Sequence, residues 1–127
     1  MGDYRPTRSE FEDVEVVVLA ERDEQGAFLM RELQRLRVAL RHVWPLPPVL
    51  PSDADVVYVD YAADLSRRLP WLPGEAKSAL VVILPQLEPV DTDAVANATP
   101  DAVLARPFTA NAIKVSLVLA RSQFRYE

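Results

Sequence analysis

The stretch ADVVYVDYAADL, residues 54–65, decides the fold. Its apolar run starts after Asp55 and stops at Asp60, where the sequence becomes polar and helix-like. An uninterrupted apolar run of this length is typical of a β-strand that is covered on both faces. Asp60 is therefore predicted to lie at the carboxyl end of a buried strand, either as a reactive carboxylate or as an ordinary turn residue.

Strand-like segments of the same character recur along the chain, at residues 14–20, 38–44, 78–85 and 101–107. Helical patterns lie between and after these strands, at residues 21–37, 63–72, 91–98 and 109–124. Asp23 and Glu24 lie near the start of the first helix, where the helix dipole favours acids. Asp91 or Thr92 is predicted to cap the third helix, and Thr109 the last.

The alternation of apolar strands and helices sets the architecture. The pattern predicts a strand–helix unit repeated five times, which implies an α/β fold with a parallel sheet covered by helices on both faces. At this length we expect a doubly wound, flavodoxin-like, five-stranded sheet of order 2-1-3-4-5. Residues 13–127 are predicted to form this domain, after a polar and flexible N-terminal lead-in over residues 1–12.

Prolines 45, 47, 48 and 51 interrupt the chain between the second and third strands. No helix or central strand tolerates this density of proline. The segment can be interpreted as a stiff connecting loop or as a PxxP ligand for an aromatic groove on another protein. The stiff loop is the favoured interpretation, because short proline-rich connections are common.

Composition excludes several classes of function. The 127 residues carry a net charge of −5, which disfavours direct binding of nucleic acid by this domain. The chain has no cysteine and a single histidine, His42, which is expected at a surface or edge position far from any pocket. Only three glycines are present, with no nucleotide-binding motif. No apolar run approaches the roughly 20 residues of a membrane span, so a cytoplasmic protein is expected. We also expect that the protein is not an enzyme.

Ligands of doubly wound sheets bind at the carboxyl ends of the strands, near the point where the strand order reverses. The residues at these ends are Glu21 after the first strand, Asp60 after the third, Pro85 after the fourth and Arg106 after the fifth. We therefore expect Glu21, Asp60, Pro85 and Arg106 to converge on one small pocket.

Two short motifs resemble response-regulator receiver domains, the CheY-like family. DVVYVDY, residues 55–61, resembles the strand that ends in the phosphoacceptor aspartate, and RPF, residues 106–108, resembles the Lys-Pro-Phe after the fifth strand. A narrower likeness comes from RLRVALRHVWPLPP, residues 35–48, which together with DVVYVDY is similar to the N-terminal domain of AmiR/NasT-type antiterminators.

The narrower resemblance implies a degenerate receiver in a transcription antitermination regulator. In that family the receiver precedes a coiled coil and an RNA-binding ANTAR module, and a sensor protein controls the dimer. RNA would then be contacted only through a downstream ANTAR domain not present in this chain. The sequence ends at QFRYE, where that family would continue into its coiled coil, so the chain is predicted to be a fragment or a stand-alone relic of a longer regulator.

The chain departs from the receiver pattern around Asp60. Ala20 stands where one of two magnesium-binding acids is expected, which leaves only Glu21 and Asp60 as metal ligands if Mg²⁺ is bound. Pro85 replaces a hydroxyl-bearing residue, and Arg106 replaces the lysine. We therefore expect Asp60 to be vestigial and paired with Arg106, with no cofactor. The alternative is a genuine magnesium-dependent phosphoacceptor of a two-component relay.

The last helical segment is more apolar than a helix with one buried face requires. The alternatives are ordinary core packing with a generous apolar face, or a second buried surface in a homodimer or against a sensor or regulator protein. The residues predicted to form this interface are Ile113, Leu117, Val118 and Leu119.

Overall fold

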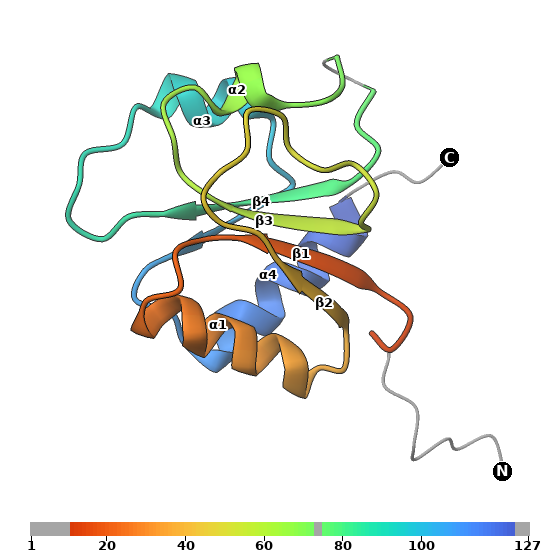
Figure 1. Ribbon diagram of the computed structural model, residues 1–127. Coiled ribbons are helices and arrows are strands. Elements are labelled where there is room, and N and C mark those ends of the chain that lie inside the picture. Colours follow the sequence, from red (N-terminus) through yellow and green to blue (C-terminus); the bar gives the residue numbers. More distant parts are fainter. Residues whose placement is uncertain (1–10, 73–74, 124–127) are drawn as a thin grey trace, which may run out of the picture.

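A parallel five-stranded sheet of order β2-β1-β3-β4-β5 forms the centre of the molecule (Figure 1). The computed structural model describes residues 11–72 and 75–123. The sheet confirms the predicted doubly wound, flavodoxin-like order. Its strands are β1 (Glu15–Leu19), β2 (Ala39–His42), β3 (Val56–Asp60), β4 (Ala79–Leu84) and β5 (Ala102–Ala105).

The register brings the carboxyl ends of the strands to one edge of the sheet. Leu19 of β1 pairs with Val59 of β3, and Asp60 pairs with Ile83 of β4. Leu84 in turn pairs with Ala105 at the end of β5. The loops after β1, β3, β4 and β5 therefore leave the sheet side by side.

Two long helices, α1 (Glu24–Arg35) and α4 (Ala110–Gln123), cover one face of the sheet (Figure 1). The Asp23 carboxylate accepts the Gly26 N–H at 2.7 Å at the start of α1, and the Thr109 hydroxyl accepts the Ala112 N–H at 3.0 Å before α4. The Thr109 cap confirms the prediction for the last helix, and Asp23, predicted only as an acid near the start of the first helix, caps it. The helices bury one cluster of apolar side chains against β1, β3 and β4, including Leu29, Leu33, Ile113, Leu117 and Ala120.

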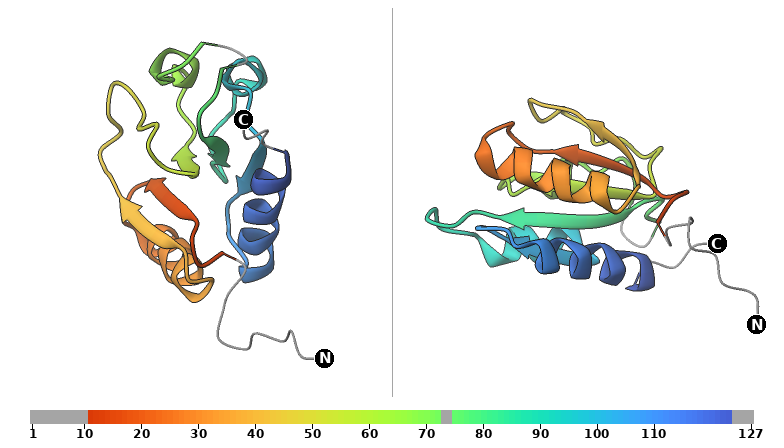
Figure 2. Two further views of the ribbon diagram at one scale, coloured as in Figure 1. Left: turned by 90° about the vertical axis from the view of Figure 1, so that its right-hand side faces the viewer. Right: turned by 90° about the horizontal axis from the view of Figure 1, so that it is seen from below.

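The opposite face is covered by much shorter elements (Figure 2). They are α2 (Leu65–Arg68) and α3 (Thr92–Ala98), and Asp91 caps α3 by accepting the Asp93 N–H at 3.0 Å. A second apolar cluster lies beneath them, including Val17, Val57, Val59, Leu65 and Ala98. Helices thus lie on both faces, as predicted, but they cover the two faces unequally.

The prediction of five complete strand–helix units is wrong for the second unit, because no helix separates β2 from β3. The proline-rich loop takes its place, and Arg68 of α2 holds this loop. The Arg68 guanidinium donates to the carbonyl oxygens of Leu46 at 3.3 Å and Pro47 at 2.7 Å. Leu50 donates its N–H to the Arg68 carbonyl at 2.7 Å and is buried. These contacts support the stiff-loop interpretation.

Phe11, which falls within the predicted lead-in of residues 1–12, packs against the domain. Phe11 is buried in the first core cluster, and its carbonyl accepts the Val14 N–H at 3.0 Å. The rest of the predicted lead-in, residues 1–10, and the final residues 124–127 lie outside the described residues. Within residues 11–72 and 75–123, no helix is long and apolar enough to cross a membrane.

Candidate functional site

A pocket of about 390 Å³ opens at the carboxyl edge of the sheet. The four residues predicted to converge here, Glu21, Asp60, Pro85 and Arg106, all line it. They come from the ends of β1, β3, β4 and β5, which the parallel register brings together. The remaining lining residues are Asp23, Trp44, Tyr61, Gln86, Leu87 and Glu88.

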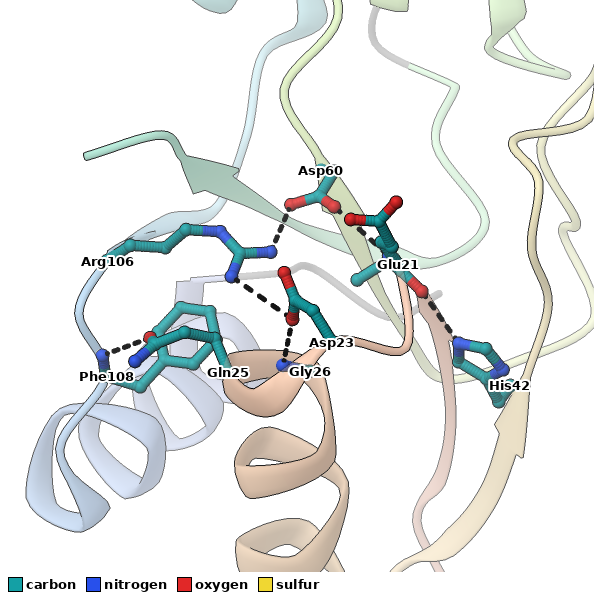
Figure 3. Close-up of polar contacts among 9 residues, drawn as sticks. Glu21, Asp23, Gln25, Gly26, His42, Asp60, Arg106 and Phe108 are labelled. Carbon is teal, nitrogen blue, oxygen red and sulfur yellow. Dashed lines mark hydrogen bonds and ion pairs between the residues drawn. The ribbon is translucent and has the colours of Figure 1, made fainter. Parts of the chain in front are cut away.

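An ion pair between Asp60 and Arg106 lies across the pocket (Figure 3). Arg106 Nη2 lies 3.0 Å from Asp60 Oδ1, and the two side chains are only 14% and 20% exposed. The other carboxylate oxygen of Asp60 accepts the backbone N–H of Glu21 at 3.4 Å. Both oxygens of Asp60 are therefore engaged within the protein.

Arg106 is held from two further sides (Figure 3). Its Nη1 lies 3.9 Å from Asp23 Oδ1, and its guanidinium lies over the Phe108 ring at 5.0 Å from the centroid. Gln25 of α1 accepts the Phe108 N–H at 3.0 Å. Sequence reasoning treated Asp23 only as a helix-start residue. Its position two residues after Glu21 was the available signal that it faces the same pocket.

The loop between β1 and α1 is tightly folded because of Gly26. A Cβ atom at this position would overlap the backbone oxygen of Glu21, so only glycine fits without a shift of the loop. The same residue donates its N–H to Asp23. Gly26 therefore fixes the positions of Glu21 and Asp23 relative to the first turn of α1.

His42 lies on edge strand β2, as expected, and it is not among the residues that line the pocket, but it contacts the loop that carries Glu21. Its Nε2 lies 2.7 Å from the Ala20 carbonyl oxygen, next to Glu21 (Figure 3). A carbonyl oxygen can only accept, so Nε2 carries a proton. Nδ1 lies 3.4 Å from Arg22 Nη2 and is then the acceptor of that contact. His42 thus ties β2 to the loop that carries Glu21.

A comparison with protein-family models shows the family of the chain. The model of the family described as "AmiR, N-terminal" matches residues 14–121. The chain belongs to this family. The match spans every strand and nearly all of the last helix. It confirms the resemblance on which the sequence expectations for Asp60 and Arg106 were based. A search of curated proteins finds no match.

Solved receiver domains share the fold of this AmiR N-terminal domain. A candidate response regulator from Chloroflexus aurantiacus J-10-fl is 16% identical with a TM-score of 0.63, covering 86% of this chain and 99% of the other. The signal receiver domain of a modulated diguanylate cyclase from Desulfovibrio desulfuricans G20 is 16% identical with a TM-score of 0.61, covering 88% and 97%. At these identities the likeness concerns the fold alone.

The side chains of this AmiR N-terminal domain do not fit a magnesium site. Mg²⁺ requires a near-octahedral set of oxygen ligands. In the part of the chain that the structure describes, no group of three or more His, Cys, Asp or Glu side chains is arranged to hold a metal ion. Asp60 is already bound to Arg106, and Ala20 contributes no carboxylate. A bound metal would require the ion pair to open.

The structure corrects the predicted interface on α4. Ile113 and Leu117 are fully buried in the core of the domain, so neither is available to a partner. Val118 and Leu119 are 41% and 43% exposed, and Val115, at the same helical spacing, is 45% exposed. These three valine and leucine side chains form an outward stripe on the side of α4 that faces away from the core.

A buried hydrogen bond connects β3 to α4. The Tyr58 hydroxyl lies 2.7 Å from Ser116 Oγ, and Ser116 Oγ donates to the Ile113 carbonyl at 2.7 Å. Because Ser116 uses its only proton on that carbonyl, Tyr58 is the donor of the first bond. Burial raises the pKa of the Tyr58 phenol above its usual value, so it remains a donor at neutral pH.

Proposed function

We propose that this domain is a phosphorylation-independent receiver of a transcription antitermination regulator and acts through protein–protein contacts. Receiver domains are regulatory modules rather than enzymes, and the AmiR N-terminal family match supports the antitermination context. The ion pair between Asp60 and Arg106 carries the phosphorylation-independent part of the proposal.

The chemistry of phosphoryl transfer explains why this ion pair supports the proposal. A carboxylate nucleophile needs a free oxygen, and the transferring phosphoryl group needs a dication to neutralise its charge. Here Arg106 already occupies one oxygen of Asp60, and the metal ligand set is incomplete. Pro85 offers neither a hydroxyl nor an N–H to a phosphoryl oxygen. These observations support an Asp60 that stands at the strand end but is not a reactive phosphoacceptor.

Incubation with acetyl phosphate and Mg²⁺ tests this proposal. We expect no mass increase in the intact chain and no saturable, Mg²⁺-dependent binding of beryllofluoride. A positive control is the triple variant Ala20→Asp, Pro85→Thr, Arg106→Lys, which restores the receiver pattern around Asp60. A phosphoryl mass increase in the unaltered chain that disappears in Asp60→Asn would support the two-component relay instead.

The outward stripe of Val115, Val118 and Leu119 supports a homodimer through α4. Exposed apolar residues at helical spacing favour burial against a partner. Light scattering at high concentration should give a dimer, and Val118→Lys should shift it to monomer. Lys114→Glu, also exposed on α4, is the control for a change of charge alone. A strict monomer at high concentration contradicts this part of the proposal.

In this mechanism a sensor protein holds the regulator inactive until the sensor binds its own ligand. RNA contact belongs to an ANTAR module rather than to this domain, because a net charge of −5 repels the phosphate backbone. We therefore expect the isolated domain to cause no mobility shift of RNA at physiological salt.

A further inference from the structure

The pocket beside Asp60 has an excess of negative charge. Among the described residues, four carboxylates line it against one guanidinium, a net charge of −3. Arg106 is committed to Asp60 and Asp23, while the Glu21 and Glu88 carboxylates have no hydrogen bond or ion pair within residues 11–72 and 75–123. Arg22, the nearest other cation of the β1–α1 loop, contacts His42 and does not line the pocket. The pocket therefore favours a positively charged group.

The walls of the same pocket include large apolar side chains that are open to solvent. Leu87 after β4 is 91% exposed and Trp44 after β2 is 41% exposed. Tyr61 lines the pocket as well, and its hydroxyl accepts the Asp91 N–H at 3.0 Å, which fixes the ring. Exposed aromatic and aliphatic residues at the edge of a pocket are typical of protein docking sites, where tryptophan is often an energetic hot spot.

We propose that this pocket docks a segment of a partner protein that inserts an arginine or lysine flanked by apolar residues. The inference rests on the proposed function, because it names the chemistry of the partner that the domain contacts. The alkyl stem of the inserted residue packs between Trp44 and Leu87. Its cationic end pairs with Glu21 and Glu88, and the Trp44 ring adds a cation–π contact.

Charge complementarity decides between a basic and an acidic partner segment. A net charge of −3 repels a carboxylate or a phosphoryl group, and the only cation among the described lining residues already has an anionic partner. Both glutamates are exposed, so each one contributes modestly, about a 2- to 5-fold change in affinity. Removal of the Trp44 side chain has a larger effect, about tenfold or more.

Peptide titration of the isotopically labelled chain, followed by NMR, tests the proposal. The probe is the acetylated, amidated tripeptide Leu-Arg-Leu, and its matched control replaces arginine by the neutral isostere citrulline. We expect the indole N–H resonance of Trp44 to shift when the arginine peptide is added. With the citrulline peptide its chemical shift should stay unchanged. The indole of Trp71, which lies outside the lining, serves as an internal control in the same spectrum.

Variants complete the test. Glu21→Gln and Glu88→Gln should each weaken binding about 2- to 5-fold, whereas Glu75→Gln, outside the pocket, should not. The proposal is overturned if the citrulline peptide or a Leu-Glu-Leu peptide binds equally well, or if the glutamate variants bind as the unaltered chain does. If free ethylguanidinium binds as tightly as the peptide, the ligand of the pocket is a small cation and not a protein segment, and the proposal is overturned.

The outcome of this test is separate from that of the proposed function. If no peptide binds and acetyl phosphate gives no mass increase, the proposed docking site is refuted. The proposal of a phosphorylation-independent receiver is then retained. A phosphoryl mass increase on Asp60 removes the proposed function whether or not the peptide binds.

Discussion

The strength of the Asp60–Arg106 pair can be measured with a double-mutant cycle of Asp60→Asn and Arg106→Met. The contact is a charge-assisted hydrogen bond of 3.0 Å between side chains that are 20% and 14% exposed. Hydrogen bonds to charged groups contribute about 1.5–3 kcal/mol, and fully exposed pairs about 0.2–1 kcal/mol. Because this pair is mostly buried, we expect a coupling free energy of about 1–2 kcal/mol.

Urea denaturation gives the free energy of unfolding of the unaltered chain, the two single variants and the double variant. The coupling free energy is the amount by which the effect of the double variant differs from the sum of the two single effects. Arg106→Met should be the more destabilising single change, because it leaves the Asp60 and Asp23 carboxylates without their shared cation. The Arg41–Asp53 pair is the matched control, since its 2.7 Å contact is shorter but its side chains are 51% and 69% exposed. Its coupling should be smaller, although Arg41 lowers the pKa of Asp53 through their hydrogen bond.

A coupling for Asp60–Arg106 no larger than that of Arg41–Asp53 would refute the reasoning. It would mean that burial does not strengthen the pair and that Asp60 is available at little cost. A coupling of about 1–2 kcal/mol, in contrast, corresponds to about a 5- to 30-fold disadvantage for any cation that must displace Arg106 from Asp60.

Four further variants test single contacts elsewhere in the domain. Gly26→Ala should destabilise the protein by about 1–3 kcal/mol in thermal unfolding, because its methyl group overlaps the Glu21 carbonyl; equal or higher stability would contradict this close approach. Tyr58→Phe should cost about 1 kcal/mol in urea unfolding. Ser116→Ala should cost more, about 1–3 kcal/mol, since it leaves the buried Tyr58 hydroxyl without its partner, and the reverse order would contradict the assigned donor. Burial raises the pKa of Asp101 in the folded protein above its ordinary value of 3.8. The contribution of this carboxyl to stability therefore grows as the pH falls through the raised pKa toward 3.8. Asp101→Asn should remove this pH dependence from unfolding measurements made over a series of pH values, and an unchanged series would contradict the prediction.

The strands could be predicted from the sequence because a parallel sheet buried on both faces leaves a simple pattern. Val16 to Leu19 and Val56 to Val59 are each continuous apolar runs and are almost completely buried. The site could be predicted for a related reason. Parallel strands end at one edge of the sheet, so the residues at the strand ends are enough to locate it. Asp60 and Arg106 could therefore be placed together although they are 46 residues apart.

Other features depend on contacts that no local pattern encodes. The proline-rich loop suggested a rigid connection, but nothing in its sequence indicated that Arg68 would bind its carbonyl groups. In α4, Ile113 and Val118 are similarly apolar, and only the packing against the sheet separates the buried residue from the exposed one. The contact of His42 with the Ala20 carbonyl could not be predicted, because it depends on the register of β2 beside β1.

The departures from the receiver pattern form a physically consistent set. Ala20 offers no carboxylate and Pro85 no hydroxyl, so without Arg106 the mostly buried carboxylate of Asp60 would have no compensating charge, which is costly. A lysine in place of Arg106 offers one point charge, whereas the guanidinium fork reaches Asp60 with one nitrogen and lies near Asp23 with the other. Its flat face also stacks on Phe108. Arg106 thus pairs with Asp60 and lies near Asp23, whereas the exposed carboxylates of Glu21 and Glu88 have no ion pair among the described residues.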